Sequence, residues 1–374
     1  MKKITYAVLL PIMLLSAISC FERDEDVDTN PTPEPEPPIL ACERVEISGD
    51  ITEPTTWTAG KVYVLNDVNI NVKSTLTIEP GTVVKLKDAA IYISGGKIVA
   101  NGTAEKRIVF TSLNDDSVCG DTNADGSATD AQKGDWTYIR LTDANGSVLK
   151  YVDILYAGQN AGGYSNAVQI WQSSNLMFEF DHCTIAHTAH DNNSYNSGAA
   201  FYGSTYMIDS KTAKFTNNIL YDNGKPLYVN TFYYVDPSNK FHNPDNPSEK
   251  NEFNAIFLGG RVLDAVVTLA HTEVPYVLSE FVQVYNSAVI NIQDDVILKF
   301  STRGGGISRS RASNVMISDK AILTSYLDDN YGGDTNGDGN QTKPTKGDWE
   351  GIYDSTPSNQ KWLTGPNILY AEKP

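Results

Sequence analysis

The chain contains one long pattern twice, and this internal repeat limits its possible folds more than any other feature. The stretch Asp121-Thr122-Asn123-Ala124-Asp125-Gly126 returns 213 positions later as Asp334-Thr335-Asn336-Gly337-Asp338-Gly339. Each stretch is followed by a Lys-Gly-Asp-Trp sequence, and the two tryptophans, Trp136 and Trp349, are also 213 positions apart. The flanking sequences keep the same order, so we expect two related segments at about 57–157 and 270–371.

Short apolar runs flank these stretches and also fill the middle of the chain. They lie at 62–65, 76–86 and 108–112 in the first segment, at 275–278, 290–292, 296–300 and 321–325 in the second, and at 167–171, 176–180, 183–185, 199–202 and 213–221 in between. Runs of this kind, bounded by Gly, Asn, Asp or Pro and without helical spacing, indicate short β-strands. Many such units in series favour a solenoid, in which each turn buries its inward side chains against its neighbours. A pair of β-sandwiches is the alternative, but it requires hairpins with two-residue turns, which we do not find in the sequence.

Three sets of residues resemble a known family. They are Leu76-Thr77-Ile78-Glu79-Pro80-Gly81-Thr82-Val83-Val84, the Gly-Asp-Trp corners at 134–136 and 347–349, and Phe215-Thr216-Asn217-Asn218-Ile219. Together they resemble right-handed parallel β-helix proteins of the pectate-lyase-like superfamily, specifically bacterial surface lipoproteins of that shape. The resemblance covers residues 47–374 and implies an all-β, right-handed parallel β-helix, but no settled activity. We place this domain at 43–374.

The repeated aspartate-rich stretches have the ligand spacing of calcium loops. In both, side-chain oxygens fall at positions one, three and five and a glycine follows, as in the first half of an EF-hand or dockerin loop. The glutamate expected at position twelve is replaced by Gln132 and Thr345, so other residues would have to close the site. The alternative is that these side chains only form turns with their own backbone. We expect structural calcium bound by Asp121, Asn123, Asp125 and Asp130 in the first loop and by Asp334, Asn336 and Asp338 in the second, with Asp115, Asp116, Asp135, Asp328, Asp329 and Asp348 as further candidates.

The N-terminal residues are expected to direct export rather than to join the fold. Residues 1–19 combine a basic start with an apolar stretch and small residues, which indicates a signal peptide. The sequence Ala17-Ile18-Ser19-Cys20 resembles a lipobox, which implies lipidation of Cys20 and a stable membrane anchor, with plain secretory cleavage as the alternative. Residues 20–42 form an acidic, Pro-rich linker. Acidic residues directly after the cysteine resemble the export signal of surface-exposed lipoproteins, which implies a lipid-anchored protein of the bacterial outer membrane.

The charge of the chain argues against a nucleic-acid partner. The formal net charge is −17, and removal of residues 1–19, which hold two lysines and no acid, makes it −19. No cluster of Lys or Arg offsets this charge, so phosphate backbones would be repelled. No segment after the signal peptide has the length and apolarity of a transmembrane helix.

Three cysteines remain once Cys20 is assigned to the lipid anchor. An odd number prevents complete pairing, so Cys42, Cys119 and Cys183 can form at most one disulfide within one chain. Their spacing matches no zinc motif. We therefore expect isolated or buried cysteines.

The sequence contains few residues that could form an active site. β-Helix lyases and hydrolases need several acids on neighbouring strands, whereas the acids here gather in the two loops. Asp181 and His182 are adjacent, and adjacent residues of a strand point to opposite faces. His187 and His190 are expected in a polar turn, and Arg140 is the remaining candidate base. We therefore assign no catalytic residue.

Aromatic residues crowd the middle of the chain and suggest a ligand-binding surface. They are Tyr195, Tyr202, Tyr206, Tyr228, Phe232, Tyr233 and Tyr234. Rings on a flat sheet face can stack on sugar rings, and the alternative is that they pack within the solenoid. We take Tyr202, Tyr228, Tyr233 and Tyr234 as candidates for binding a glycan or a surface protein. A binding or adhesin-like module is the favoured function, with a polysaccharide-degrading enzyme and a passive structural surface protein as alternatives.

Overall fold

The computed structural model describes residues 42–162, 165–171, 176–190, 198–203, 211–231, 233–260, 262–263, 265–302, 304–310, 313–356 and 360–373. The expected signal peptide, Cys20 and all but the last residue of the linker lie outside these ranges, as do Tyr195, Tyr206 and Phe232. Every regular element within the described residues is a β-strand, which confirms the all-β prediction. None of these residues belongs to a helix that could span a bilayer.

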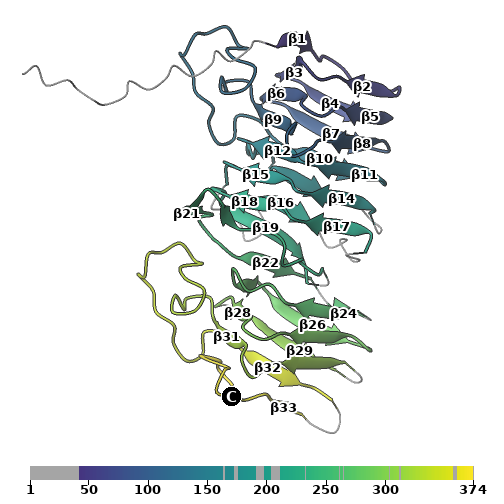
Figure 1. Ribbon diagram of the computed structural model, residues 1–374. Helices are drawn as coiled ribbons and strands as arrows, with labels where there is room; N and C mark the ends of the chain where they lie inside the picture. Colours follow the sequence, from purple (N-terminus) through teal and green to yellow (C-terminus); the bar gives the residue numbers. More distant parts are fainter. Residues whose placement is uncertain are drawn as a thin grey trace, which may run out of the picture. The chain divides into compact units, whose positions relative to one another are not determined.

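The first part of the domain is a coil of three parallel sheets, which the chain visits in the same order on every turn (Figure 1). The seven-stranded sheet contains β1 (Glu43–Glu46), β3 (Lys61–Asn66), β6 (Val83–Lys87), β9 (Ile108–Ser112), β12 (Val152–Leu155), β15 (Thr184–Ala186) and β18 (Ile219–Tyr221). The six-stranded sheet contains β2 (Thr55–Trp57), β5 (Thr75–Ile78), β8 (Lys97–Asn101), β11 (Ser147–Lys150), β14 (Phe178–Asp181) and β17 (Ala213–Thr216).

The third sheet has ten strands and continues through the second part of the domain. It contains β4 (Asn69–Val72), β7 (Ala90–Ser94), β10 (Ile139–Thr142), β13 (Val168–Ile170), β16 (Ala199–Gly203), β19 (Lys225–Asn230), β22 (Ile256–Gly259), β25 (Tyr276–Leu278), β28 (Ile297–Phe300) and β31 (Ile322–Ser325). It is joined there by a five-stranded sheet of β23 (Val262–Leu263), β26 (Phe281–Tyr285), β29 (Gly306–Arg309), β32 (Gly351–Asp354) and β33 (Lys361–Trp362), and by a three-stranded sheet of β24 (Val266–Leu269), β27 (Val289–Ile292) and β30 (Asn314–Ile317).

Strand pairing confirms a parallel β-helix and rules out the pair of sandwiches. Among the described strands, only β20 (His242–Asn243) with β21 (Asn246–Lys250) and β32 with β33 pair antiparallel. All other pairs are parallel, and each links strands that are one turn of the coil apart. This arrangement is consistent with the right-handed coil that parallel crossovers favour.

The core consists of the inward side chains of successive turns. In β7, Ile91 and Ile93 are fully buried, whereas Tyr92 between them points outward and is half-buried. Phenylalanine rings continue the stack in the middle of the coil, where Phe180 and Phe215 are in register on neighbouring turns and their ring centroids are 6.3 Å apart. Burial of each such side chain stabilises the fold by about 1.5–3 kcal/mol. Each turn therefore depends on the turns above and below it.

The two repeated segments occupy different sheets. Strands β3, β6 and β9 of the first segment belong to the seven-stranded sheet, whereas their equivalents β25, β28 and β31 belong to the ten-stranded sheet. The change occurs after β17 and β18, where the six- and seven-stranded sheets end. The antiparallel hairpin of β20 and β21 lies in this region. The second segment is thus displaced by one sheet relative to the first.

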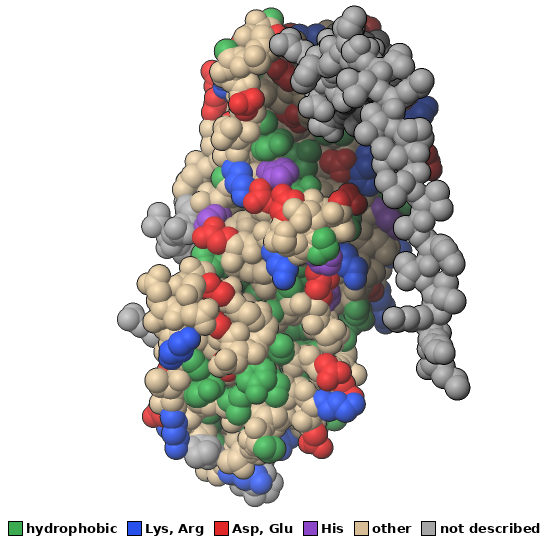
Figure 2. All heavy atoms as spheres, turned by 60° about the vertical axis from the view of Figure 1, so that its left-hand side comes forward, with side chains coloured by type: hydrophobic (Ala, Val, Ile, Leu, Met, Phe, Trp, Pro, Cys, Tyr) green, Lys and Arg blue, Asp and Glu red, His purple; other side chains and the backbone are tan. Residues whose placement is uncertain are grey.

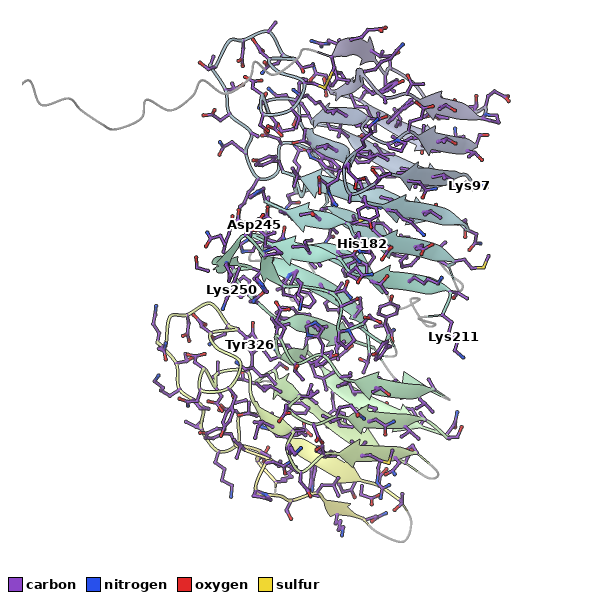
Figure 3. All side chains as sticks on the ribbon, in the orientation of Figure 1. Lys97, His182, Lys211, Asp245, Lys250 and Tyr326 are labelled. Atoms are coloured by element: carbon purple, nitrogen blue, oxygen red, sulfur yellow. A yellow bond between two sulfur atoms is a disulfide. The ribbon has the colours of Figure 1, made fainter. Side chains whose placement is uncertain are left out.

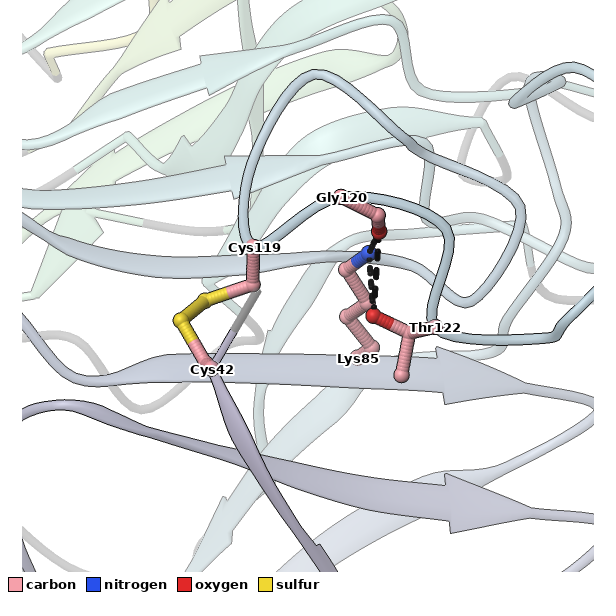
Figure 4. The surroundings of a disulfide bond; sticks show 5 residues. All are labelled: Cys42, Lys85, Cys119, Gly120 and Thr122. Atoms are coloured by element: carbon pink, nitrogen blue, oxygen red, sulfur yellow. Dashed lines mark hydrogen bonds between the residues drawn. A yellow bond between two sulfur atoms is a disulfide. The ribbon is translucent and has the colours of Figure 1, made fainter. Parts of the chain in front are cut away.

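A disulfide ties the residue before β1 to the first aspartate-rich loop (Figure 4). It joins Cys42 and Cys119, whose Cα atoms are 5.1 Å apart. The expectation of isolated cysteines is wrong for this pair, because strand stacking brings the start of β1 near the loop that follows β9. It is confirmed for Cys183, whose thiol is buried and unpaired.

Loss of this disulfide is expected to destabilise the domain. The bond links residues 77 positions apart, and closing a loop of that length is worth about 4–5 kcal/mol in the chain-entropy account. We expect dithiothreitol to lower the free energy of unfolding by a large part of this amount, as measured by urea unfolding. A Cys42→Ser/Cys119→Ser variant should not respond to the reductant. Equal stability of the unmodified protein with and without reductant would contradict the assignment.

Candidate metal loops and ligand-binding face

The two aspartate-rich loops leave the coil at equivalent strands and return to it through the same contacts. The first loop connects β9 to β10, and the second connects β31 to β32. Each ends at a buried tryptophan whose indole Nε1 donates a hydrogen bond to a backbone carbonyl. Trp136 donates to Leu155 over 2.7 Å, and Trp349 donates to Leu369 over 2.8 Å. Both loops are therefore attached to the core through equivalent tryptophans.

Four of the candidate aspartates hold the ends of the loops. Thr111 Oγ1 donates to Asp115 over 2.6 Å, and Ser112 Oγ donates to Asp135. The second loop repeats this pattern with Thr324 on Asp328 and Ser325 on Asp348, both at 2.6 Å. One carboxylate oxygen of each of these four aspartates therefore already accepts a hydrogen bond from a side-chain hydroxyl group.

Asp121 and Asp334 shape the tight turn that follows them. Asp121 accepts hydrogen bonds from the backbone N–H groups of Asp125 at 3.2 Å and Gly126 at 2.8 Å. Asp334 accepts the equivalent bonds at 3.1 and 2.8 Å. These are the backbone turns that the alternative interpretation predicts. The turn alone, however, does not account for the carboxylates that gather around it.

Each loop brings three carboxylates together. The oxygens of Asp116, Asp121 and Asp125 lie within 4.8 Å of one another, and so do those of Asp329, Asp334 and Asp338. Asp116 and Asp329 come from the start of each loop and add a third carboxylate to the two from the turn. Of the further candidate ligands, the described geometry brings only these two into the clusters.

Several oxygens of these clusters are buried without a hydrogen-bond partner among the described residues. They are Oδ1 of Asp116, both carboxylate oxygens of Asp329, and Oδ1 of Asn336. Burial and the nearby Asp121 carboxylate raise the pKa of Asp116, and burial and Asp334 raise the pKa of Asp329. A buried oxygen without a donor costs free energy, so each cluster is unfavourable when all of its carboxylates are charged and unpaired.

The remaining predicted ligands are placed differently. The amide nitrogens of Asn123 and Asn336 each donate to the aspartate two positions later over 2.9 Å. This contact fixes the orientation of both amides. Asp130 is exposed and does not belong to the carboxylate cluster, and the second loop has Lys343 at its position.

Sequence reasoning missed a buried lysine beneath each loop. Lys85 Nζ donates to the carbonyl of Gly120 and to Thr122 Oγ1, both at 2.8 Å (Figure 4). Lys299 makes the same contacts, at the same distances, with Gly333 and Thr335. Both side chains are fully buried, and burial lowers the pKa of Lys299 to about 8. A lysine at the same place in two otherwise apolar runs was the signal that could have identified them.

The predicted ligand-binding tyrosines divide into two groups. Tyr233 is 1% exposed and its hydroxyl donates to the carbonyl of Ala213, so it belongs to the core and cannot contact a ligand. Tyr202 and Tyr228 point outward from the ten-stranded sheet and stack at 5.2 Å, but Tyr228 is only 8% exposed. Tyr234 is half-buried. The expected platform is therefore mostly covered.

A more exposed aromatic group lies further along the same outward face. The guanidinium of Arg140 lies 4.4 Å from the ring centroid of Tyr138, 5.3 Å from that of Trp171 and 5.4 Å from that of Tyr92. Arg140 also donates from Nε to Gln169 over 2.8 Å. Trp171 is 43% exposed, so this group offers an open ring above a fixed positive charge.

His182 and His187 lie at corners of the coil rather than on strands. His182, labelled in Figure 3, has a φ of 55° in the turn after β14. Its Nδ1 lies 3.0 Å from the carboxylate of Asp181. The prediction that Asp181 and His182 point to opposite faces is wrong. His182 lies in a left-handed corner, where side chains no longer alternate between the two faces of a strand. His187 likewise has a φ of 56° and contacts Asp222.

Comparison with known proteins agrees with the fold. Residues 49–203 match the family described as pectate-lyase like beta helix domain. This range includes the first aspartate-rich loop and the group around Arg140. No curated protein and no solved structure is detectably similar to the chain. The match and the stacked parallel strands identify a parallel β-helix protein with a pectate-lyase-like domain.

Removal of the buried ammonium group is expected to loosen the first loop. In a Lys85→Met variant, the carbonyl of Gly120 loses its lysine donor, which should cost about 1–3 kcal/mol. Urea unfolding measures this loss, and limited proteolysis should show faster cleavage within the loop. Lys87→Met, on the same strand and half-buried, is the matched control. Equal stability of the two variants would show that Lys85 does not hold the loop.

Proposed function

We propose that the protein is an exported, lipid-anchored β-helix that is stabilised by two calcium ions and presents a glycan-binding face outside the cell. The calcium sites rest on one observation: among the described residues, a carboxylate oxygen of Asp116 in the first loop and the oxygens of Asp329 and Asn336 in the second are buried without a hydrogen-bond partner. The binding face rests on the exposed ring of Trp171 beside Arg140.

The donor set of each loop fits a hard cation. Three carboxylates and an amide oxygen are available in each, from Asp116, Asp121, Asp125 and Asn123 in the first loop and from Asp329, Asp334, Asp338 and Asn336 in the second. Calcium accepts six to eight oxygen ligands in flexible geometry, so water and backbone carbonyls would complete the shell. The ion would neutralise the clustered carboxylates and order a long loop.

Export is supported by the cysteine chemistry. Disulfides persist in oxidising compartments, and Cys42 and Cys119 are joined. The proposed lipid anchor at Cys20 would hold the domain through the linker at a membrane. The acidic residues after Cys20, which resemble the export signal of surface-exposed lipoproteins, support placement at the surface of the outer membrane.

Neighbours of Arg140 favour binding over catalysis. On the adjacent strands of the ten-stranded sheet, the residues in register with Arg140 are Tyr92 and Gln169, and neither is an acid. A lyase or hydrolase of this fold would need acids within reach of such a base. An exposed tryptophan with an arginine and an amide beside it offers stacking to a sugar ring and hydrogen bonds to its hydroxyl groups. A passive coat protein would not need this arrangement.

Calcium is expected to stabilise the domain through both loops. At 1 mM calcium, sites with the affinity of extracellular modules should each add about 0.4–1.4 kcal/mol to the free energy of unfolding. Thermal unfolding in calcium and in chelator measures the total, and isothermal titration calorimetry should give two ions per chain. Magnesium at the same concentration is the control ion.

The Asp116→Asn variant is expected to shift the melting temperature in opposite directions without and with calcium. Without calcium it should melt at a higher temperature than the unmodified protein, because it removes a carboxylate that is repelled by Asp121. With calcium it should melt at a lower temperature and bind one ion fewer. Asp329→Asn should do the same for the second loop. If both variants respond to calcium as the unmodified protein does, the aspartates only form turns.

The binding face is tested by removing its exposed ring. A glycan array identifies ligands, and titration calorimetry then compares variants on one of them. Trp171→Ala should weaken binding by at least about tenfold, which corresponds to about 1.4 kcal/mol. Met177→Ala, which removes another exposed apolar side chain, should leave the affinity unchanged. Unchanged binding by Trp171→Ala, or release of cleaved sugar products, would exclude this function.

A further inference from the structure

A third group of metal-ligating side chains lies apart from the aspartate-rich loops. His187, Asp222 and Glu249 offer ligand atoms that all lie within 4.8 Å of one another. His187 Nδ1 and Asp222 Oδ2 are 2.7 Å apart. All three residues are half-buried, and in Figure 2 histidine side chains lie among acidic and basic ones near the middle of the face shown. This group differs from the calcium clusters because it includes an imidazole.

The fold brings the three residues together from separate turns of the coil. His187 follows β15 and Asp222 follows β18, the neighbouring strand of the same sheet. Both adopt left-handed backbone conformations, with φ of 56° and 49°. Glu249 belongs to β21 of the antiparallel hairpin, where its Oε2 accepts a hydrogen bond from Asn243 over 2.7 Å. The hairpin thus adds a carboxylate to a corner that the coil already provides.

Neighbouring side chains fix the orientation of the histidine and the aspartate. Tyr156 lies at the same corner one turn earlier and stacks on His187, with ring centroids 5.0 Å apart and planes at 16°. Lys133 Nζ donates to Asp222 Oδ1 and to its backbone carbonyl, both at 2.7 Å. The other carboxylate oxygen, Oδ2, therefore points toward His187. Residues outside the coordination sphere usually orient metal ligands through hydrogen bonds of this kind.

We propose that His187, Asp222 and Glu249 form a surface site for a divalent transition-metal ion such as Zn²⁺. One imidazole and two carboxylates suit zinc, copper or nickel, whereas calcium takes oxygen ligands alone. Three protein ligands leave a fourth position for water or for a group from another molecule. This site does not depend on the proposed calcium loops.

Metal entry requires a small rearrangement. The ion takes the place of the proton between His187 and Asp222. Two ligands of a tetrahedral zinc ion, each about 2.0–2.2 Å from the metal, are about 3.3 Å apart. The present separation of 2.7 Å must therefore widen by about half an ångström. Both side chains leave from turns and are partly exposed, at 23% and 34%, so rotation of the side chains can supply this change.

The chain provides a matched control in His182. It also occupies a left-handed corner, stacks on a tyrosine with centroids 4.6 Å apart, and lies 3.0 Å from an aspartate. It is not among the described groups of three ligands. Asn is suitable for both replacements because it tolerates left-handed conformations and already stands at Asn217, the same corner one turn after His182.

The experiment is titration of Zn²⁺ into the full domain, with millimolar calcium present to fill the proposed loops. The unmodified protein and His182→Asn should bind one zinc ion with equal affinity. His187→Asn should bind more than about tenfold more weakly, because loss of even an outer contact commonly costs that much. Glu249→Gln, on the exposed hairpin, should also weaken binding and keeps the test valid if His187→Asn does not fold.

Two results would overturn the proposal. One is zinc binding by His187→Asn and Glu249→Gln that equals that of the unmodified protein. The other is an equal loss in His182→Asn, which would indicate adventitious binding to surface histidines. Calcium titrations of the same variants test the calcium proposal separately. Every variant should bind two calcium ions, whether or not it binds zinc.

Discussion

Stacking of equivalent side chains on successive turns is the constraint on which the rest of the structure depends. Each turn buries its inward residues against its neighbours, as Phe180 and Phe215 do, which are in register on neighbouring turns with ring centroids 6.3 Å apart. A long loop can therefore leave one corner without disturbing the core. Ile139 remains in register with Ile91 although the first aspartate-rich loop precedes it. The coil supplies rigidity, and the corners and outward faces remain available for chemistry.

Each aspartate-rich loop combines clustered carboxylates with a buried lysine, Lys85 in the first loop and Lys299 in the second. Lys85 donates hydrogen bonds to the residues on either side of Asp121, to the backbone carbonyl of Gly120 and to the side-chain hydroxyl of Thr122. One ammonium group cannot neutralise three clustered carboxylates, and an oxygen of Asp116 has no hydrogen-bond donor among the described residues. The second loop repeats this imbalance. A divalent cation is the simplest partner that would balance the charge.

Local features of the sequence were sufficient to predict the strands and the coil, because alternating burial and turn residues are encoded within a few positions. Contacts between distant turns were not predictable in this way. The disulfide and the position of Asp116 beside Asp121 and Asp125 depend on where a long loop folds back. The burial of Tyr233 depends on which face of its turn is inward. The pairing of Asp181 with His182 depends on a left-handed corner that the apolar pattern does not reveal.

The one-sheet displacement between the repeated segments bears on how such a chain could arise. If a duplicated block spans a whole number of turns, every strand returns to its sheet of origin. Here β25, β28 and β31 continue a different sheet from β3, β6 and β9, so the duplicated length includes a fraction of a turn. The additional fraction of a turn lies in the irregular region that contains the β20–β21 hairpin. Growth of a β-helix by gene duplication therefore need not follow its geometric period, provided that one sheet runs unbroken across the junction.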